Sequence, residues 1–331
     1  MKIAIDGMGG DNAPQVIVRG VVDGVNEFGH NVVIVGDKLS IERELSGLKF
    51  PAERIEVCHS SQVVEMGESP AVTIRKKKDS SISVGVRLVK EGKADAFVSA
   101  GNTGAVVCAA TLYLGLLPGI ERAGIAIIYP TPAGISMLID VGANITPKPI
   151  HLLQYGFMGD AYSKHILGKK NPTIGLLNVG EEETKGTDFV KETHKLLIDS
   201  MLNFVGNIEG RDIFSGKTDV IVCDGFAGNV VLKVAESLTL TISKFLRREL
   251  NKNVITRLGA LLSRPAFKGL KKDLDYTEYG GAPLLGVAGA ITICHGSSNA
   301  KAIKNAVRVT GEYVNRRVNE HIAEEIASDI S

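Results

Sequence analysis

The chain has 331 residues, of which 44% are hydrophobic and 23% charged, a composition typical of a globular protein with a sizeable core. Thirty-eight basic residues nearly balance thirty-seven acidic ones, and aromatic residues make up only 5%, with no Trp. Without a global positive field or aromatic platforms for bases, nucleic acid is not an expected partner.

The sequence also bears on location and on metals. Its first residues enter a predicted strand directly, and no apolar run approaches the roughly 20 residues of a membrane span, so we expect a cytoplasmic protein. The cysteines form no Cys-x-x-Cys pair and the histidines no His-Glu-x-x-His motif. We therefore expect reduced thiols, no metal and no bound cofactor.

Strands and helices alternate through the first part of the chain. Apolar periodicity predicts strands at 3–5, 32–35 and 55–58 and helices at 14–28, 41–45 and 82–89. Such alternation indicates parallel strands joined by helices, as in a three-layer α/β/α Rossmann-like fold.

A dense charge run, Arg75, Lys76, Lys77 and Lys78, lies between two of these elements. A run of this kind is either a solvated helix face or a surface that receives an anion or an acidic partner. Both interpretations remain open from the residues alone.

The next junction joins a strand at 96–99 to an apolar helix at 105–117 through Gly101-Asn102-Thr103-Gly104. The glycines let a ligand approach the backbone, and Asn102 and Thr103 can cap the helix or reach the ligand. The first amides of the helix would then form an anion site. A ligand-free turn between strand and helix is the alternative.

The second half of the chain predicts a mixed sheet. Runs at 125–129 and 135–139 flank a Pro-Thr-Pro-Ala-Gly turn, which favours an antiparallel hairpin. Further elements are strands at 173–177, 203–205, 220–223 and 290–294 and helices at 151–167, 188–202 and 299–326. Because no repeat or linker interrupts the pattern, we expect one α/β domain over residues 1–331.

Residues 244–275 are expected to form a protruding, inserted helical segment. From 244 to 272 there are nine basic residues and one acid, Glu249, with apolar residues at spacings of three and four. This pattern favours an anionic membrane surface or an acidic protein as partner, and packing on the core or on a dimer partner is the alternative. The candidate docking residues are Arg257, Leu258, Leu261, Leu262, Arg264 and Lys268.

Turns rich in Gly, Asn and Asp follow predicted strands at six places. Because the strands of a doubly wound sheet point their carboxyl ends to one edge, we expect these turns to converge into a cleft. The dinucleotide fingerprint Gly-x-Gly-x-x-Gly, the P-loop pattern and the Gly-x-Ser-x-Gly elbow are all missing. Two carboxylates, Asp6 and Asp11, would also repel a diphosphate in the first turn.

Seven motifs, taken in order and spacing, resemble the PlsX family, the acyl-carrier-protein:phosphate acyltransferases of bacterial phospholipid synthesis. They comprise Asp6-Gly7-Met8-Gly9-Gly10-Asp11 within 5–14, Ser99-Ala100-Gly101-Asn102-Thr103-Gly104 within 99–105, and the stretches 140–144, 175–180, 224–229, 279–282 and 295–297. The resemblance covers nearly the whole chain, with small departures at Gly7 and at 128–132. It implies an isopropylmalate-dehydrogenase-like or phosphotransacetylase-like fold with a mostly parallel mixed sheet.

The same resemblance implies an activity. A long-chain acyl-carrier-protein thioester and inorganic phosphate would give acyl phosphate, feeding glycerol-3-phosphate acylation. It also implies a homodimer and reversible, peripheral membrane association. The chemistry fits independently, because phosphate is itself the nucleophile and a thiol with a pKa of about 8.5 can leave, so neither a covalent intermediate nor a metal is required.

The expected catalytic residues are Asn102, Lys185, Asn229 and His295. Lys185 would bring positive charge to the phosphate, and His295 would shuttle a proton unless it is only structural. For docking, we assign the apolar stripe of the basic segment to the membrane and the run 75–78 to acyl carrier protein. The expected phosphate ligands are Gly9, Gly10, Asp11, Gly101, Thr103, Gly104, Asn178, Gly180, Asp224, Gly225 and Gly228.

Two other functions remain open. A metal- and NAD-dependent decarboxylating dehydrogenase on the same fold could recruit Asp140 and Asp224, although no fingerprint supports the cofactor. A non-catalytic membrane-associated adaptor would use the basic segment and leave the glycine turns unexplained.

Overall fold

The computed structural model describes residues 1–273 and 276–330. The strands are β1 (Lys2–Asp6), β2 (Asn31–Gly36), β3 (Ile55–His59), β4 (Ala96–Ser99), β5 (Gly124–Thr131), β6 (Gly134–Ile139), β7 (Ile174–Asn178), β8 (Phe204–Glu209), β9 (Val220–Val222), β10 (Ala282–Leu285) and β11 (Ala290–Ile293). The α-helices are α1 (Gln15–Phe28), α2 (Lys38–Leu45), α3 (Pro70–Lys76), α4 (Ser81–Lys90), α5 (Thr103–Tyr113), α6 (Pro149–His165), α7 (Asp188–Asp199), α8 (Gly225–Leu250), α9 (Val254–Leu262), α10 (Arg264–Asp273), α11 (Ala300–Asn315) and α12 (Val318–Ile330).

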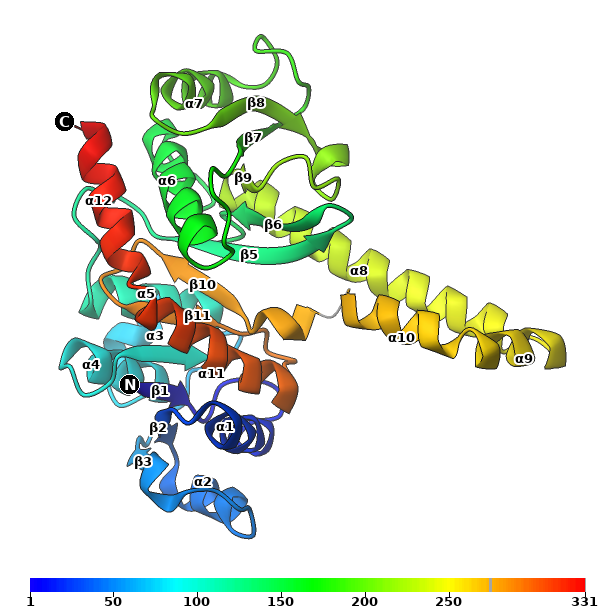
Figure 1. Cartoon of the computed structure of the whole chain (residues 1–331). Helices are drawn as coiled ribbons and strands as arrows, with labels where there is room; N and C mark the ends of the chain where they lie inside the picture. Colours follow the sequence, from blue (N-terminus) through cyan, green and yellow to red (C-terminus); the bar gives the residue numbers. More distant parts are fainter. Residues whose placement is uncertain (274–275, 331) are drawn as a thin grey trace.

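Eleven strands of the described chain form one sheet in the order β3-β2-β1-β4-β11-β10-β5-β6-β9-β7-β8. Helices cover both of its faces (Figure 1). The predicted hairpin is present, with β5 and β6 paired antiparallel. The expected three-layer α/β/α fold with a mostly parallel mixed sheet is confirmed.

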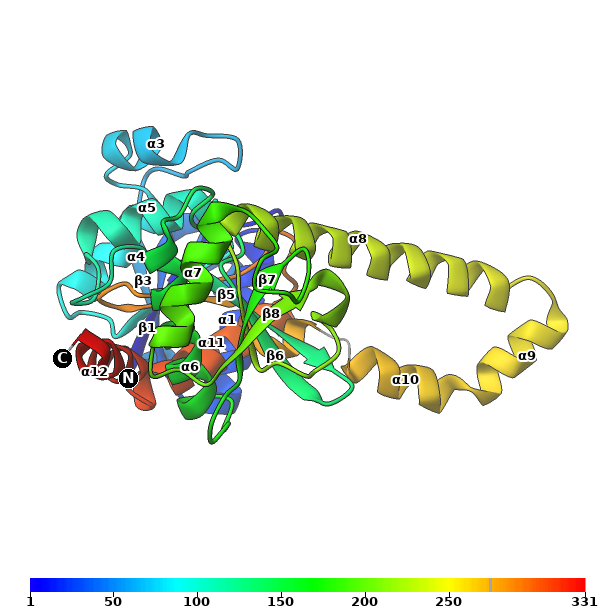
Figure 2. The same cartoon turned by 90° about the horizontal axis from the view of Figure 1, so that it is seen from above.

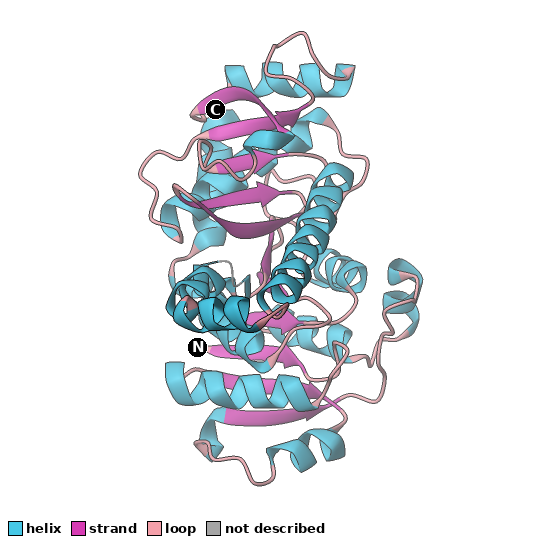
Figure 3. Cartoon of the chain, turned by 90° about the vertical axis from the view of Figure 1, so that its right-hand side faces the viewer, coloured by secondary structure: helices cyan, strands magenta, loops and turns pink. Residues whose placement is uncertain are grey.

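Two parallel sets of strands make up this sheet. Strands β1 to β4 and β11 form one set, and β6 to β9 form the other. Three antiparallel pairings separate the sets, so they run in opposite senses along the ladder. Each strand is rotated by about 20–25° relative to its neighbour in the sheet. Added up across the sheet, this twist reverses the direction of one set relative to the other. In Figure 3 both sets therefore point toward the same side of the molecule.

Alternation along the strands explains why helices cover both faces. Ile3 and Ile5 of β1 are buried in one apolar cluster with Val18 of α1 and Ile303 of α11. Ala4 points the other way and joins a second cluster that includes residues of α4 and α5. Each face of the sheet thus has a core of its own.

Several details differ from the sequence predictions. The helix predicted at 105–117 ends at Tyr113, because the chain turns at Gly115, where φ is +83°, toward a bridge between Leu116 and Val287. The single helix predicted at 299–326 is two helices, broken at Arg317, whose φ is +52°. Strand β10 was not predicted.

Helices α8, α9 and α10 form an arm that projects from the body (Figure 1, Figure 2). Its first helix has 26 residues and starts at the sheet, directly after β9. The arm therefore begins well before residue 244, while positions 274 and 275 of the expected segment lie outside the described residues. Within the described chain, no helix combines the length and apolar character needed to cross a bilayer.

Candidate functional site

Three turns meet at the carboxyl ends of β1, β4 and β11. Ser99 Oγ donates to Asp6 Oδ2 over 2.7 Å, and Met8 N donates to Asp6 Oδ1 over 3.1 Å. Asp11 N donates to the Gly296 carbonyl oxygen over 2.8 Å. We call the turns at 6–14, 99–104 and 295–299 the first turn cluster.

Gly9 sits at the centre of this cluster. A Cβ at this position would lie 2.4 Å from Asp6 Oδ2 and 2.6 Å from Gly101 N, so only glycine fits. Asp6 is 1% exposed, and burial raises its pKa above the ordinary value against the opposing effect of its hydrogen bonds. The carboxyl group of Asp6 therefore organises the turns and does not face solvent.

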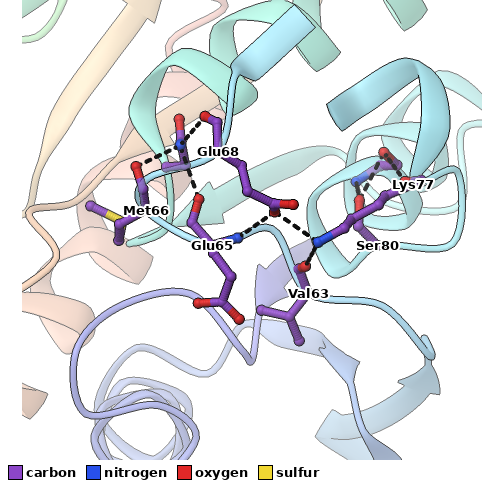
Figure 4. Close-up of polar contacts among 8 residues, drawn as sticks. Val63, Glu65, Met66, Glu68, Lys77 and Ser80 are labelled. Atoms are coloured by element: carbon purple, nitrogen blue, oxygen red, sulfur yellow. Dashed lines mark hydrogen bonds and ion pairs between the residues drawn. The ribbon is translucent and has the colours of Figure 1, made fainter. Parts of the chain in front are cut away.

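Asn102 caps α5 and also holds a neighbouring loop. Its Oδ1 accepts from Ala105 N over 3.0 Å. Its Nδ2 lies within hydrogen-bond distance of the carbonyl oxygens of Glu65, Met66 and Glu68, the loop drawn in Figure 4. Both polar atoms of the Asn102 side chain are thus occupied by the protein.

The first amides of α5 remain for a ligand. In residues 1–273 and 276–330, no protein group accepts from the backbone N–H of Thr103 or Gly104. Such N–H groups at the start of a helix, together with the helix dipole, bind anions. The Thr103 side chain is exposed at the same point.

His295 lies in the β11–α11 turn with its ring exposed. Its Nδ1 lies 2.7 Å from Ser297 Oγ and accepts a hydrogen bond of 3.2 Å from Ser297 N. Because a backbone N–H can only donate, Nδ1 is the acceptor and the proton of the neutral ring is on Nε2. His295 can therefore offer an N–H to a ligand through Nε2.

Asp140, at the end of β6, organises a second group of turns. Its carboxylate accepts from the backbone N–H groups of Ile125, Gly142, Ala143 and Asn144 over 2.7 to 3.0 Å. Burial raises the pKa of Asp140, and those four amides partly offset this effect. The carboxyl oxygens that a metal would need are thus taken by the backbone.

The start of α8 packs against this turn. Gly225 N donates to the Asn144 carbonyl oxygen over 2.9 Å, and a Cβ on Gly228 would lie 1.9 Å from the Asp140 carbonyl oxygen. Asp224 is the N-cap, since its Oδ1 accepts from Ala227 N over 2.9 Å. Asn229 is exposed in the first turns of α8. We call the turns at 140–144 and 224–229 the second turn cluster.

The loop after β7 carries the expected cation. Asn178 Nδ2 donates to the Lys185 carbonyl oxygen over 3.2 Å, and Asn178 Oδ1 accepts from Val179 N over 2.8 Å, so Asn178 shapes the loop. A Cβ on Gly180 would lie 3.0 Å from Lys185 Cγ. Lys185 is exposed, and its ammonium forms no ion pair with any residue that the structure describes.

Comparison with known proteins places the chain in a family. Residues 1–321 match the family model described as fatty acid synthesis protein. A phosphate acyltransferase of Alkaliphilus oremlandii is 50% identical over 328 residues, which cover 99% of this chain and 98% of the relative. Another, of Geobacter sulfurreducens, is 47% identical over 331 residues, which cover 100% of this chain and 96% of the relative. The chain belongs to the phosphate acyltransferase family. It is an acyltransferase of lipid synthesis.

Solved structures agree on the fold. A phosphotransacetylase from Streptococcus pyogenes superposes with a TM-score of 0.67 at 18% identity, covering 95% of this chain and 94% of that one. The phosphotransacetylase EutD of Staphylococcus aureus gives a TM-score of 0.59 at 16% identity, covering 95% and 94%. A 4-hydroxythreonine-4-phosphate dehydrogenase from Klebsiella pneumoniae gives 0.56 at 13% identity, covering 95% and 97%. The phosphotransacetylase-like fold implied by the sequence is confirmed.

The expected site residues of this phosphate acyltransferase fall into separate groups. Within the described ranges, no hydrogen bond or ion pair joins the first turn cluster to the second, although both lie on the side toward which the strands point (Figure 3). The first cluster contains Gly9, Gly10, Asp11, Gly101, Asn102, Thr103, Gly104 and His295. The second contains Asp224, Gly225, Gly228 and Asn229, and the β7 loop contains Asn178, Gly180 and Lys185.

The candidate docking residues differ in how available they are. Lys77 Nζ lies 2.7 Å from Glu68 Oε2, so this lysine is paired within the protein, whereas Arg75, Lys76 and Lys78 are exposed. In α9, no described residue is buried. The exposed fractions are 58% for Leu258, 62% for Leu261 and 76% for Leu262.

Sequence reasoning undervalued the two buried acids. Asp6 is the last residue of β1 and Asp140 directly follows β6. Each precedes a glycine turn and accepts hydrogen bonds from the backbone of that turn. In the sequence, each of these buried acids is indicated by a single acidic residue between an apolar strand and a glycine turn.

Proposed function

We propose that the protein transfers a long-chain acyl group from an acyl-carrier-protein thioester to inorganic phosphate, giving acyl phosphate and the free carrier thiol. The observation that carries the proposal is the arrangement of backbone N–H groups at the start of α5. This arrangement occurs in a chain that belongs to the phosphate acyltransferase family. There the Thr103 and Gly104 amides have no acceptor among the described residues and lie beside turns that only glycine can form. An oxyanion of phosphate suits such a site.

In the proposed reaction, one phosphate oxygen attacks the thioester carbonyl carbon and the C–S bond then breaks. The amides of Thr103 and Gly104 hold the phosphate in place for attack. The proton of the phosphate passes to the departing thiolate, and the Nε2–H of His295 donates a hydrogen bond that stabilises the departing sulfur. Lys185 and Asn229, from the β7 loop and the second turn cluster, stabilise the charge on the phosphate and on the developing oxyanion.

Asn102 has a different task in this proposal. Because its Oδ1 and Nδ2 are both engaged, it acts as a positioning residue that fixes the start of α5 and the 65–68 loop. Gly9, Gly10, Asp11 and Gly101 bring the backbone close to the ligand. Gly225 and Gly228, with the cap Asp224, set the direction of α8, and Asn178 and Gly180 shape the loop that carries Lys185.

We also propose roles for the arm. The apolar face of α9, with Leu258, Leu261 and Leu262, docks on an anionic membrane, and the cations Arg257, Arg264 and Lys268 add attraction to the lipid headgroups. A second exposed apolar stripe runs along α8 at spacings of three and four, which suits the partner helix of a homodimer. Its members are Val230, Val234, Leu238, Ile242 and Phe245.

The acyl carrier protein is proposed to dock beside α3. Arg75, Lys76 and Lys78 are exposed there, next to α5, against which α3 packs. Carrier proteins of this kind are acidic, so attraction to these cations should weaken as salt screens the charges.

One assay separates this function from the alternatives. Palmitoyl-acyl carrier protein and inorganic phosphate are incubated with the protein, with and without NAD and a divalent cation, and acyl phosphate is trapped with hydroxylamine. The proposal expects equal product in all arms. Product that requires NAD and metal would favour the dehydrogenase, and no product in any arm would favour the adaptor.

A further inference from the structure

The loop that precedes α3 carries an exposed methionine at the edge of the first turn cluster. Met66 is 55% exposed, and its terminal methyl lies 3.4 Å from the position that a Cβ on Gly296 would occupy. Asp11 Oδ1 lies 3.5 Å from the same position. Met66 therefore borders the turns on which the proposed reaction depends.

The backbone on both sides of Met66 is held by polar contacts (Figure 4). Asn102 Nδ2 lies 3.2 Å from the Glu65 carbonyl oxygen, 3.0 Å from that of Met66 and 3.3 Å from that of Glu68. Glu65 N donates to Glu68 Oε2 over 2.8 Å, and Glu68 N donates to the Glu65 carbonyl oxygen over 3.2 Å. The loop is thus a closed turn fastened to the N-cap of α5.

Lys77 secures the far side of the same loop. Its Nζ lies 2.7 Å from Glu68 Oε2 and 2.7 Å from the Val63 carbonyl oxygen. The Lys77 and Glu68 side chains are only 28% and 32% exposed, so water screens this pair less than a fully exposed one. The hydrogen bond from Lys77 also holds the pKa of Glu68 below its ordinary value.

Folding gains little from fixing an exposed methionine in this way. A half-exposed side chain removes little apolar area from water, whereas ordering the loop costs conformational entropy. A thioether side chain is unbranched and polarizable, so it adapts well to the surface of an alkyl chain. An ordered apolar side chain at the edge of a phosphate site thus suits a substrate whose thioester reacts with phosphate and whose acyl chain is apolar.

We propose that Met66 is a specificity-determining residue that contacts the acyl chain close to the thioester. Asn102 and the Lys77–Glu68 pair are the positioning residues that hold Met66 there. This inference rests on the proposed function and adds to it the residue that distinguishes long from short acyl groups.

The test compares long and short acyl groups. The kcat/KM is measured with palmitoyl and acetyl thioesters of acyl carrier protein for the wild type, Met66→Gln and Val72→Ala. Because the acetyl group lacks the methylenes next to the thioester, Met66→Gln is expected to lower the palmitoyl-to-acetyl ratio about tenfold, the scale of one or two lost methylene contacts. Val72 is the matched control, because it is 50% exposed on the adjacent α3. Its variant should keep the ratio within about twofold.

The positioning pair gives a second readout. Lys77→Met should lower the same ratio, and Lys77→Arg should restore it, because arginine can still pair with Glu68. A wild-type ratio in Met66→Gln, or an equal fall in Val72→Ala, would overturn the inference. If the wild-type protein forms no acyl phosphate from either thioester, the proposed function itself fails and this inference with it.

Discussion

Ser99 Oγ donates a hydrogen bond of 2.7 Å to Asp6 Oδ2, so the buried carboxyl group at the end of β1 is fastened to the end of β4. Gly9 lies directly against this pair, because a Cβ there would stand 2.4 Å from the same oxygen. The first turn cluster therefore depends on a glycine that leaves room for a buried acid.

We predict that Gly9→Ala damages both stability and turnover. The added methyl must displace Asp6 or Gly101, which should lower the free energy of unfolding by about 1–3 kcal/mol. The resulting shift of the turns should lower kcat/KM about 10²-fold. Urea unfolding and acyl phosphate formation measure the two effects. The control is Gly210→Ala, since no atom of the described residues lies within 4 Å of a Cβ at that exposed glycine, and equal behaviour of the two variants would refute the prediction.

His295 is expected to act as a hydrogen-bond donor through Nε2. His295→Ala should lower kcat about 10²-fold, the scale of one lost donor to a developing charge. Ser297→Ala is the control, because it removes one contact to Nδ1 and keeps the backbone N–H that orients the ring. If His295→Ala keeps the wild-type kcat, the residue is structural.

The arm should separate membrane binding from catalysis. Replacing Leu258, Leu261 and Leu262 by Glu removes apolar area and adds repulsion from anionic lipid. We predict that this variant no longer sediments with anionic vesicles yet keeps its KM for acyl carrier protein in solution. Should it bind vesicles normally and lose its dimer in analytical ultracentrifugation, α9 would be an interface helix instead.

A charged group between α6 and α12 sets a dependence of stability on pH. Lys164 pairs with Asp160 and lies 3.1 Å from Glu325 Oε1, while Glu325 Oε2 is buried and forms no hydrogen bond with any described residue. Burial, reinforced by the charge of Asp160, raises the pKa of Glu325 to about 7. The folded state therefore binds more protons here than the unfolded state between about pH 4.5 and 7, so this group makes the protein less stable as pH rises through that window.

We predict that Glu325→Gln removes this slope. The variant should gain about 1–2 kcal/mol relative to the wild type between pH 5 and pH 8, less than the full shift because the side chain is 23% exposed. His165, whose pKa is lowered by burial and by His321, gives the opposite slope in both proteins and cancels in the comparison. Urea unfolding at the two pH values provides the measurement, and parallel curves for the two proteins would count against it.

Local patterns predicted most of the fold. The alternating strands and helices follow from apolar periodicity, and the mixed sheet follows from the short turn between β5 and β6. Strand β10 was not predicted because it is four residues long and contains Pro283, which removes a backbone donor. The helix break at Arg317 was not predicted because Val314 and Val318 keep the helical spacing across it and no glycine or proline marks it.

The site was predicted less completely than the fold. Capping by Asn102 and Asp224 is local and readable from the sequence. The second role of Asn102, which is to hold the 65–68 loop, is not readable from the sequence, because its carbonyl partners lie 34 to 37 residues earlier. The same holds for Asp6, whose partner Ser99 is 93 residues away. Such contacts arise from the packing of the turns and leave no periodic signal.

The proposed reaction requires that the first amides of α5 hold phosphate, and Thr103→Pro tests this requirement directly. Proline at the first position of a helix removes one N–H and keeps the helix, and Asn102 already has the extended backbone that precedes a proline. Asp188→Pro makes the same change in α7, away from the turn clusters. We predict that Thr103→Pro raises the KM for phosphate or lowers kcat about 10²-fold, beyond the effect of Thr103→Ala, while Asp188→Pro resembles the wild type. Unchanged phosphate kinetics in a folded Thr103→Pro protein would contradict the claim.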